Sequence, residues 1–293
     1  MESSAARIPE LAKRVLFAAV AGPATVLLVR LGGLPLALLI SAASGVAAWE
    51  LYRLARAAGS QPIEAIGIPL AALLPLYAGT EPRGVFDASP ALIAGMLLLV
   101  LTVAIWTRGA SGQPLSAVAT TLFGVGYTGG LLAFGIAIRN HRYVTSDVGG
   151  AVLLLLPVLA TWINDIGAYA AGHIVGGRKL IPSVSPGKTV AGAVGGLIAT
   201  VLFSWLYVSW VLEPVAQLAM RRGTLLLFAV AVGVAGQVGD LAESLLKREA
   251  GAKDSSHLFP GHGGVLDRID SLLFALPVAW AIFTLPGVLV VKL

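Results

Sequence analysis

The sequence has 293 residues, of which 57% are hydrophobic and 12% are charged, and its formal net charge is +5. A soluble domain carries about 25% charged residues, so a chain this apolar cannot cover itself with a wetted surface. The lack of cysteine excludes disulfides, thiolate metal sites and thiol catalysis. The composition predicts a membrane protein, in which the positive charge is expected from basic loops rather than from a nucleic-acid partner.

Apolar runs long enough to span a bilayer recur along the whole chain. They predict an all-α integral membrane protein, a polytopic bundle, rather than a barrel of short alternating strands. A polar leader at residues 1–12 is expected to precede nine transmembrane helices in a single domain, 1–293. The nine helices are predicted at 15–29, 35–54, 63–78, 91–106, 115–138, 152–175, 190–212, 225–246 and 265–291.

Two of these predictions leave alternatives open. The first run follows Lys13 and Arg14 and could be a signal peptide, but eight further spans favour a retained helix. The third run is short and contains two prolines, so it is expected to be tilted or broken.

Lysine and arginine positions predict the orientation. With the N-terminus in the cytoplasm, thirteen of the 20 basic residues fall in inside loops and seven fall outside. This bias predicts a multi-pass protein of the inner (plasma) membrane with its N-terminus in the cytoplasm. The loops after the sixth and eighth spans then both face the cytoplasm.

The polar segment between the last two spans, residues 244–270, holds 8 of the chain's 35 charged residues. Charge beside hydrocarbon is costly, so such a cluster indicates a function. Asp240 lies in the eighth span roughly 9 Å before its predicted end, at about 1.5 Å per residue. Ser244 and Lys247 follow at i+4 and i+7 on the same helix face. A structural Asp–Lys pair is the alternative to a ligand site.

Asp267 and Asp270 stand three residues apart where the ninth span begins. Two carboxylates so close repel each other unless a cation lies between them or one is protonated, although acidic residues also suit a first helical turn. Together with Asp240 they are expected to converge on Mg²⁺, a hard cation that prefers oxygen ligands. A second cation at the same place is left open.

Pro-Gly-His-Gly-Gly at 260–264 precedes that helix. Its glycines would let the backbone approach a ligand, and the helix would offer its first amides to an anion, although an ordinary loop explains the glycines too. Basic side chains that suit phosphate oxygens surround this turn, namely Lys247, Arg248, Lys253, His262 and Arg268.

The loop after the sixth span reads Ser-Pro-Gly-Lys-Thr at 185–189. A phosphate-binding P-loop would need glycine five positions before Gly187, where Pro182 stands, so that reading is excluded. A basic, glycine-containing turn still suits a phosphate or a lipid headgroup. In the sixth span, Asp165, Tyr169 and Gly172 share one face.

These motifs together resemble the phosphatidate cytidylyltransferase (CDP-diacylglycerol synthase) family. The family signature is present in order as Ser244, Lys247-Arg248, Lys253-Asp254, 260–264 and Asp-Arg-x-Asp at 267–270. Asp165 with Tyr169, the loop at 185–189 and Gly195 are also similar to the family. The resemblance covers residues 160–277, which would be the catalytic part.

The resemblance implies transfer of CMP from CTP to phosphatidic acid, giving CDP-diacylglycerol and pyrophosphate, at the cytoplasmic membrane face. CTP, phosphatidic acid and bilayer lipids would be the partners, without nucleic acid, and a homodimer is also implied. The lipid phosphate is already an anionic nucleophile, so positioning and charge neutralisation are the main demands.

Site roles follow as hypotheses. The metal is assigned to Asp240, Asp267 and Asp270, with Asp165 as a fourth carboxylate and Lys247 also catalytic. Contacts with substrate and phosphate are assigned to Ser185, Lys188, Thr189, Ser244, Arg248, Lys253, His262, Gly263, Gly264 and Arg268.

Three other functions compete with this one. An ion-coupled transporter also places acids in broken helices, but it predicts two repeated halves, and the sequence has no such repeat. A related CTP transferase could act on another lipid phosphate, such as an archaeal ether lipid or a polyprenyl phosphate. A structural scaffold would leave the acidic cluster unexplained.

Overall fold

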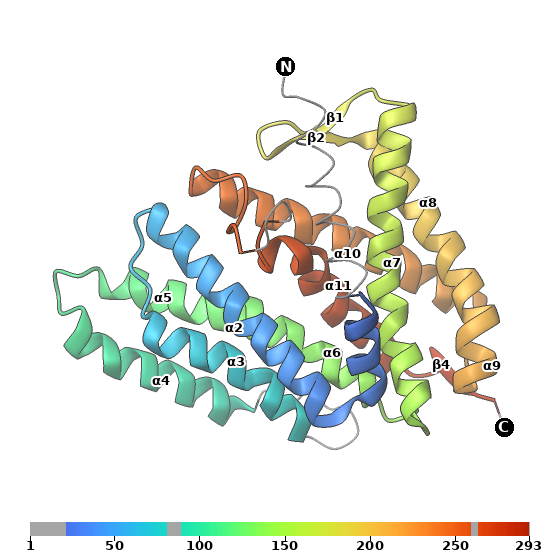
Figure 1. The fold of residues 1–293 in the computed structure, drawn as a ribbon, viewed down its shortest axis with the longest axis horizontal. Coiled ribbons are helices and arrows are strands. Elements are labelled where there is room, and N and C mark those ends of the chain that lie inside the picture. The colour runs from blue at the N-terminus through green and yellow to red at the C-terminus, as the bar shows by residue number, and fades with distance from the viewer. Residues whose placement is uncertain (1–21, 81–88, 259–262, 293) are drawn as a thin grey trace.

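The computed structural model describes residues 22–80, 89–258 and 263–292, which are mainly helical (Figure 1). A helix at Gly22–Leu31 comes first. The helices that follow are α2 (Gly33–Ala57), α3 (Glu64–Thr80), α4 (Pro90–Thr107), α5 (Pro114–Gly124), the π-helix η2 (Val125–Gly130), α6 (Leu131–Arg139), α7 (Asp147–Ile174), α8 (Val190–Tyr207), the π-helix η3 (Val208–Leu212), α9 (Glu213–Ala216), α10 (Arg222–Glu249) and α11 (Leu266–Thr284).

Six helical segments of the described chain are long and apolar enough to cross a membrane: α2, α4, the run Pro114–Arg139, α7, the run Val190–Ala216 and α10. The all-α membrane class is thereby confirmed. The predicted count of nine is not, because α3 has 17 residues and contains Pro69 and Pro75, and α11 is not among the six. Residues 15–21 of the first predicted span lie outside the described residues.

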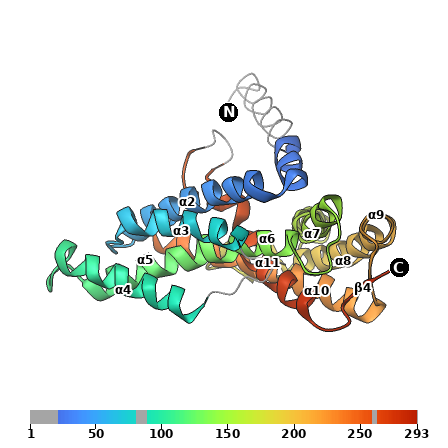
Figure 2. The same ribbon diagram turned by 90° about the horizontal axis from the view of Figure 1, so that it is seen from below.

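The helices form two groups on either side of a central pair. Helices α2 to α6 lie on one side and α7 to α9 on the other, with α10 and α11 packed together between them (Figures 1 and 2). Large side chains such as Phe228 of α10 and Phe283 of α11 are fully buried and stack with ring centroids 5.0 Å apart. The hydrophobic core therefore continues through the centre of the molecule, between α10 and α11. The polar residues of these two helices, described below, also lie there.

Glycine lets α8 lie directly against α7. A Cβ atom at Gly192 would come within 2.7 Å of the Ala168 carbonyl oxygen, and one at Gly196 within 2.8 Å of that of Asn164. Small residues at such a seam allow close backbone approach between membrane helices. This contact brings the polar residues of α7 next to the segment that precedes α8.

That segment is a hairpin rather than the predicted loop. Strand β1 (Lys179–Ile181) pairs antiparallel with β2 (Ser185–Thr189) beside the C-terminal end of α7. A second antiparallel pair, β3 (Leu218–Met220) with β4 (Leu289–Val291), lies beyond the other end of the α8–α9 run. The first hairpin places the Ser-Pro-Gly-Lys-Thr sequence next to α10.

Candidate active site

A cavity of about 790 Å³ lies between α7, the β1–β2 hairpin, α8 and α10. Its size is that of a small-molecule site. The polar side chains in its wall come from three separate motifs of the sequence: Asn164, Asp165, Tyr169, His173, Lys179, Lys188, Thr189, Gln237 and Asp240. The fold thus unites the sixth span, the basic turn and the eighth span around one space.

An ion pair joins the hairpin to α10 across this cavity. Lys188 Nζ lies 2.5 Å from Asp240 Oδ2, and both side chains are about a third exposed. Asp240 Oδ1 also lies 3.5 Å from the Ser244 hydroxyl. The charges of Asp240 and Lys188 both act on Asp165, which faces them from α7. Lys188 is therefore a cation of the cavity wall that an anionic ligand could contact.

The inner end of the cavity is an ordered amide network. Asn164 Nδ2 donates to the Thr200 hydroxyl at 2.9 Å, and its Oδ1 accepts from Gln237 Nε2 at 3.1 Å. The same Gln237 nitrogen donates to the Ala193 carbonyl oxygen at 2.9 Å. Because both amides have a fixed orientation, this end of the cavity presents defined polar groups to a ligand.

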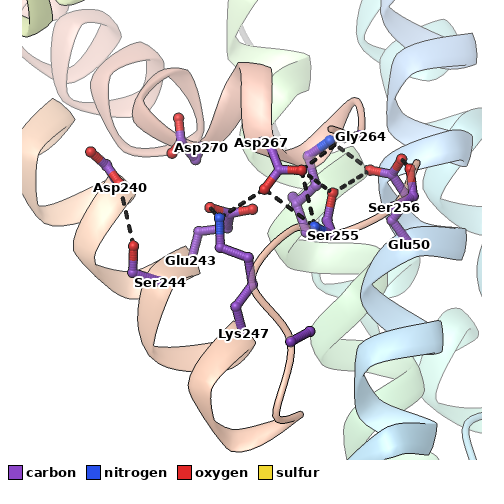
Figure 3. A network of polar contacts seen from close by, with 12 residues as sticks. Glu50, Asp240, Glu243, Ser244, Lys247, Ser255, Ser256, Gly264, Asp267 and Asp270 are labelled. Atoms are coloured by element: carbon purple, nitrogen blue, oxygen red, sulfur yellow. Dashed lines mark hydrogen bonds and ion pairs between the residues drawn. The ribbon is translucent and has the colours of Figure 1, made fainter. Parts of the chain in front are cut away.

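A second polar cluster lies further along α10, near its C-terminal end, around Lys247 (Figure 3). The buried Lys247 Nζ lies 2.5 Å from Glu243 Oε2 on its own helix and 2.7 Å from Asp267 Oδ1 on α11. Glu243 is fully buried. One ammonium group between two carboxylates offsets part of their charge and is itself held in place by them.

Asp267 is held by several further donors. Its Oδ2 accepts from the backbone nitrogen of Ser255 at 3.0 Å, from the Ser255 hydroxyl at 2.8 Å and from Gly264 N at 2.8 Å. Gly263, with φ +75°, turns the chain into this position, and a side chain there would come within 2.6 Å of Asp267 Oδ2. Both carboxylate oxygens of Asp267 are therefore engaged by the protein itself.

Asp270 of α11 is not part of the cavity wall but lies beside α10. Gly239 of α10 packs against its backbone, since a Cβ at Gly239 would come within 2.5 Å of the Asp270 carbonyl oxygen. The charges of Asp240 and Asp165 both act on Asp270. Figure 3 shows Asp270 on the Asp240 side of the cluster, whereas Asp267 points towards Ser255 and Glu50.

The predicted metal triad stays a prediction. Among the residues that the structure describes, no three His, Asp or Glu side chains form a group that could hold a metal ion. Asp267 contacts Lys247 Nζ at 2.7 Å, whereas Asp270 lies on the Asp240 side of the cluster (Figure 3).

The first amides of α11 contact the protein's own carboxylates. Gly264 N donates to Asp267, while Val265 N and Leu266 N donate to Glu50 at 3.0 and 2.7 Å. The phosphate contacts assigned to Gly263 and Gly264 stay predictions. His262 lies outside the described residues.

The remaining predicted phosphate ligands are spread over the surface and the hairpin. Arg248 donates to the carbonyl oxygens of Val184 and Ala252 at 3.2 and 3.3 Å, and so ties the hairpin turn to α10. The side chains of Lys253 and Arg268 are exposed. These positions leave their phosphate roles as predictions.

Two of the predicted hydroxyl contacts have other positions than expected. The Thr189 hydroxyl lines the cavity but accepts from Gly192 N at 3.0 Å, and so caps α8. Ser185 begins β2 at the hairpin turn and is not part of the cavity wall. Ser244 is buried beside Asp240.

Sequence reasoning missed Glu243 and Glu50. Glu243 stands at i+3 from Asp240 and four residues before Lys247, so the helical spacing that linked those two also placed it on their face. Glu50 is a carboxylate in an apolar span, and the cost argument applied to Asp240 would have marked it as well. It is fully buried against the segment that carries Asp267.

Comparison with known proteins gives consistent matches. The sequence model of the cytidylyltransferase family matches residues 12–285. The phosphatidate cytidylyltransferase of Bacillus subtilis (strain 168) is 34% identical over 279 residues, which cover 94% of this chain and 98% of that protein.

Two further relatives match the chain over a shorter stretch. The phosphatidate cytidylyltransferase of Haemophilus influenzae is 42% identical over 48% of this chain and 49% of its own length. That of Thermotoga maritima is 40% identical over 46% of this chain and 50% of its own length. For these two relatives the similarity thus spans about half of each protein.

Proposed function

Since this chain belongs to the cytidylyltransferase family, we infer that it is an enzyme, a phosphatidate cytidylyltransferase. It transfers CMP from CTP to phosphatidic acid and releases pyrophosphate. One observation carries this inference: the 34% identity to a relative of that name extends over 94% of the chain and nearly the whole of the relative. The apolar helices agree with a lipid acceptor.

The cavity is the proposed site for the nucleotide phosphates. Lys188 and Lys179 are cations in its wall, and the pairing of Lys188 with the partly exposed Asp240 is of the kind that contributes little to stability. A triphosphate can therefore replace Asp240 as the partner of Lys188. The two acids near it, Asp240 and Asp165, would then be left facing the same phosphates, which calls for an additional positive charge.

Magnesium is the proposed source of that charge. Mg²⁺ is bound in proteins through one or two carboxylates together with substrate phosphates. Asp240 and Asp270, whose charges act on each other, are the residues that would hold it, with Asp165 nearby. When bound, the ion would neutralise charge on the phosphates and on the leaving pyrophosphate.

Lys247 is the proposed cation for the acceptor side. Its ammonium lies near the end of α10, fixed between Glu243 and Asp267. A fixed cation costs no reorganisation when the lipid phosphate attacks the α-phosphorus of CTP. The lipid phosphate is already ionised, so none of these carboxylates is required to remove a proton.

The membrane arrangement is proposed from the charge bias and the motifs together. The hairpin and the segment between α10 and α11 are assigned to the cytoplasmic face of the inner membrane, where CTP is available. The nine spans, the catalytic part at residues 160–277 and a homodimer belong to the same proposal. Protease accessibility of the hairpin in inverted and right-side-out vesicles tests the orientation.

The direct test is an assay with the protein purified in detergent, labelled CTP, phosphatidic acid and Mg²⁺. We expect CDP-diacylglycerol and pyrophosphate in equal amounts, and loss of both with excess EDTA. UTP in place of CTP is the nucleotide control, and a polyprenyl phosphate in place of phosphatidic acid tests the related transferase activity. Folded protein that forms no CDP-diacylglycerol would contradict the proposal.

A further inference from the structure

Helix α2 contributes a buried carboxylate to the segment that carries Asp267. Glu50 is fully buried and lies within hydrogen-bond distance of four donor groups, all on residues more than two hundred positions away (Figure 3). The donors are two hydroxyls and two backbone amides: Ser255 Oγ at 3.1 Å, Ser256 Oγ at 2.5 Å, Val265 N at 3.0 Å and Leu266 N at 2.7 Å.

This set of four donor groups requires a carboxylate as its acceptor. An ionised carboxylate offers about four acceptor positions, whereas the amide of glutamine accepts at one oxygen and presents an NH₂ group at the other end. The negative charge also faces the first amides of α11, where a helix favours an anion. Glu50 therefore acts as a cap for α11 that is supplied by a distant helix.

A second residue of α2 contacts the same place. Arg53 Nη2 donates to the backbone carbonyl oxygen of Ser255 at 2.5 Å. The guanidinium group lies 5.8 Å from the centre of the Trp49 ring. Helix α2 thus holds Ser255 through its hydroxyl and through its main chain.

Ser255 connects Glu50 to the Lys247 cluster. Its hydroxyl, which has one proton, lies between two carboxylates, 3.1 Å from Glu50 Oε2 and 2.8 Å from Asp267 Oδ2. Asp267 in turn holds Lys247 at 2.7 Å. A continuous chain of short contacts therefore runs from α2 to the ammonium group.

We propose that Glu50 is a positioning residue for the transferase reaction, which sets the Asp267–Lys247 pair by holding Ser255 and the first amides of α11. The kinetic effect expected from this proposal rests on the proposed function. The structural effect rests on the geometry alone. It gives the N-terminal half of the molecule a part in the site, although the motifs lie in the C-terminal half.

The first measurement needs no activity. Amide hydrogen exchange is compared between the unchanged protein, Glu50→Gln and a control, Glu64→Gln, in which the replaced acid of α3 pairs with Arg56 of α2. We expect Ser255, Ser256 and residues 263–266 to exchange roughly tenfold faster in Glu50→Gln, as a lost helix cap permits, and to be unaltered in Glu64→Gln. Unaltered exchange in Glu50→Gln overturns the proposal.

The second measurement is kinetic. A displacement of about 1 Å can cost on the order of 100-fold in rate, so Glu50→Gln is expected to lose about that factor in kcat while KM for CTP changes by less than about threefold. Ser255→Ala is expected to lose activity as well, and the double variant should be no slower than Glu50→Gln. If the rate loss of the double variant instead equals the product of the two single losses, the two residues act independently.

The outcomes separate the two proposals. If the unchanged protein forms no CDP-diacylglycerol, the proposed function fails, and hydrogen exchange alone decides the role of Glu50. If that protein is active and Glu50→Gln keeps its kcat per folded molecule, the positioning role is wrong. Should Glu50→Gln not fold, Ser255→Ala takes its place in both measurements, and unchanged exchange and kcat there overturn the proposal.

Discussion

Two polar clusters on α10 use the same residue types in different ways. In the cavity wall, Asp240 and Lys188 form one ion pair, and each side chain is about a third exposed. Nearer the C-terminal end of α10, Lys247 is buried between Glu243 and Asp267, and Asp267 accepts further hydrogen bonds from Ser255 and Gly264. The cavity cluster can exchange partners with a ligand, whereas Lys247 and Asp267 are already engaged by the protein.

This difference distinguishes the residues that can bind a ligand from the residues that hold a cation in place. Breaking an exposed pair costs about 0–1 kcal/mol, whereas removing one partner of a buried pair costs about 3–5 kcal/mol. The pair facing the cavity can therefore open for a phosphate at little cost. The buried pair instead keeps a cation in place, and its substitution should affect folding as well as turnover.

Replacing Asp240 should give the largest loss of activity. Asp240→Asn removes the charge proposed to hold magnesium, and we expect kcat to fall on the order of 1000-fold, comparable with the loss of a main transition-state contact. Because Asp240 is partly exposed, the free energy of unfolding should change by less than about 1 kcal/mol. Initial rates and thermal unfolding in detergent measure the two effects. A large loss of stability would contradict the distinction between the cavity cluster and the Lys247 cluster.

Replacing Asp267 should reduce both quantities. Asp267→Asn leaves Lys247 with Glu243 as its remaining carboxylate partner among the contacts described above, and the loss in unfolding free energy is expected to be about 3 kcal/mol. Activity per folded molecule should fall on the order of 100-fold, because the ammonium is no longer fixed. The same rate and unfolding experiments apply. Normal stability with abolished turnover would instead favour Asp267 as a metal ligand.

Lys188 should affect nucleotide binding more than turnover. Lys188→Met removes a cation of the cavity wall, and a lost charge-assisted hydrogen bond of about 1.5–3 kcal/mol raises KM for CTP roughly 10- to 100-fold. The KM for phosphatidic acid should stay within about threefold if Lys247 serves the acceptor. Arg248→Met is a matched control, since Arg248 holds the hairpin without lining the cavity. Equal effects of both substitutions would assign Lys188 to the hairpin alone.

The all-α class could be predicted from the sequence because it depends on local patterns. Apolar length located most of the helices within about five residues, and helical spacing put Asp240, Ser244 and Lys247 on one face. The ninth span was predicted to reach residue 291, but α11 ends at Thr284 and the chain continues into β4. The hairpin was missed because strands β1 and β2 have three and five residues, too short for an alternating pattern to show.

Side-chain direction could not be predicted in the same way. Asp267 and Asp270 are three residues apart and share a helix face by spacing, yet one faces Lys247 and the other faces Asp240. That division depends on Ser255 and Glu50, which are distant in sequence. Long-range partners of this kind are set by packing, and no local pattern contains them.

His141 lies outside both clusters of α10. It stands in the turn that precedes α7, whereas the cavity is lined by the other, C-terminal end of that helix. It is 2% exposed, and its Nε2 has no hydrogen-bond partner in the described structure. Burial, together with the nearby positive charge of Arg142, lowers the pKa of His141 from 6.5 to about 4. The folded protein therefore holds this imidazole neutral.

The smallest expected effect is a pH dependence of stability caused by His141. Since its pKa is lower in the folded state than in the unfolded chain, its contribution is complete above about pH 6.5 and declines as the pH falls towards 4. His141→Phe should remove that part of the decline, leaving kcat and KM at pH 7.5 unchanged within about twofold because the turn is remote from the cavity. Thermal unfolding between pH 4 and 8 measures it. An activity loss in His141→Phe would show that this turn is coupled to the site and that the site extends beyond the two clusters on α10.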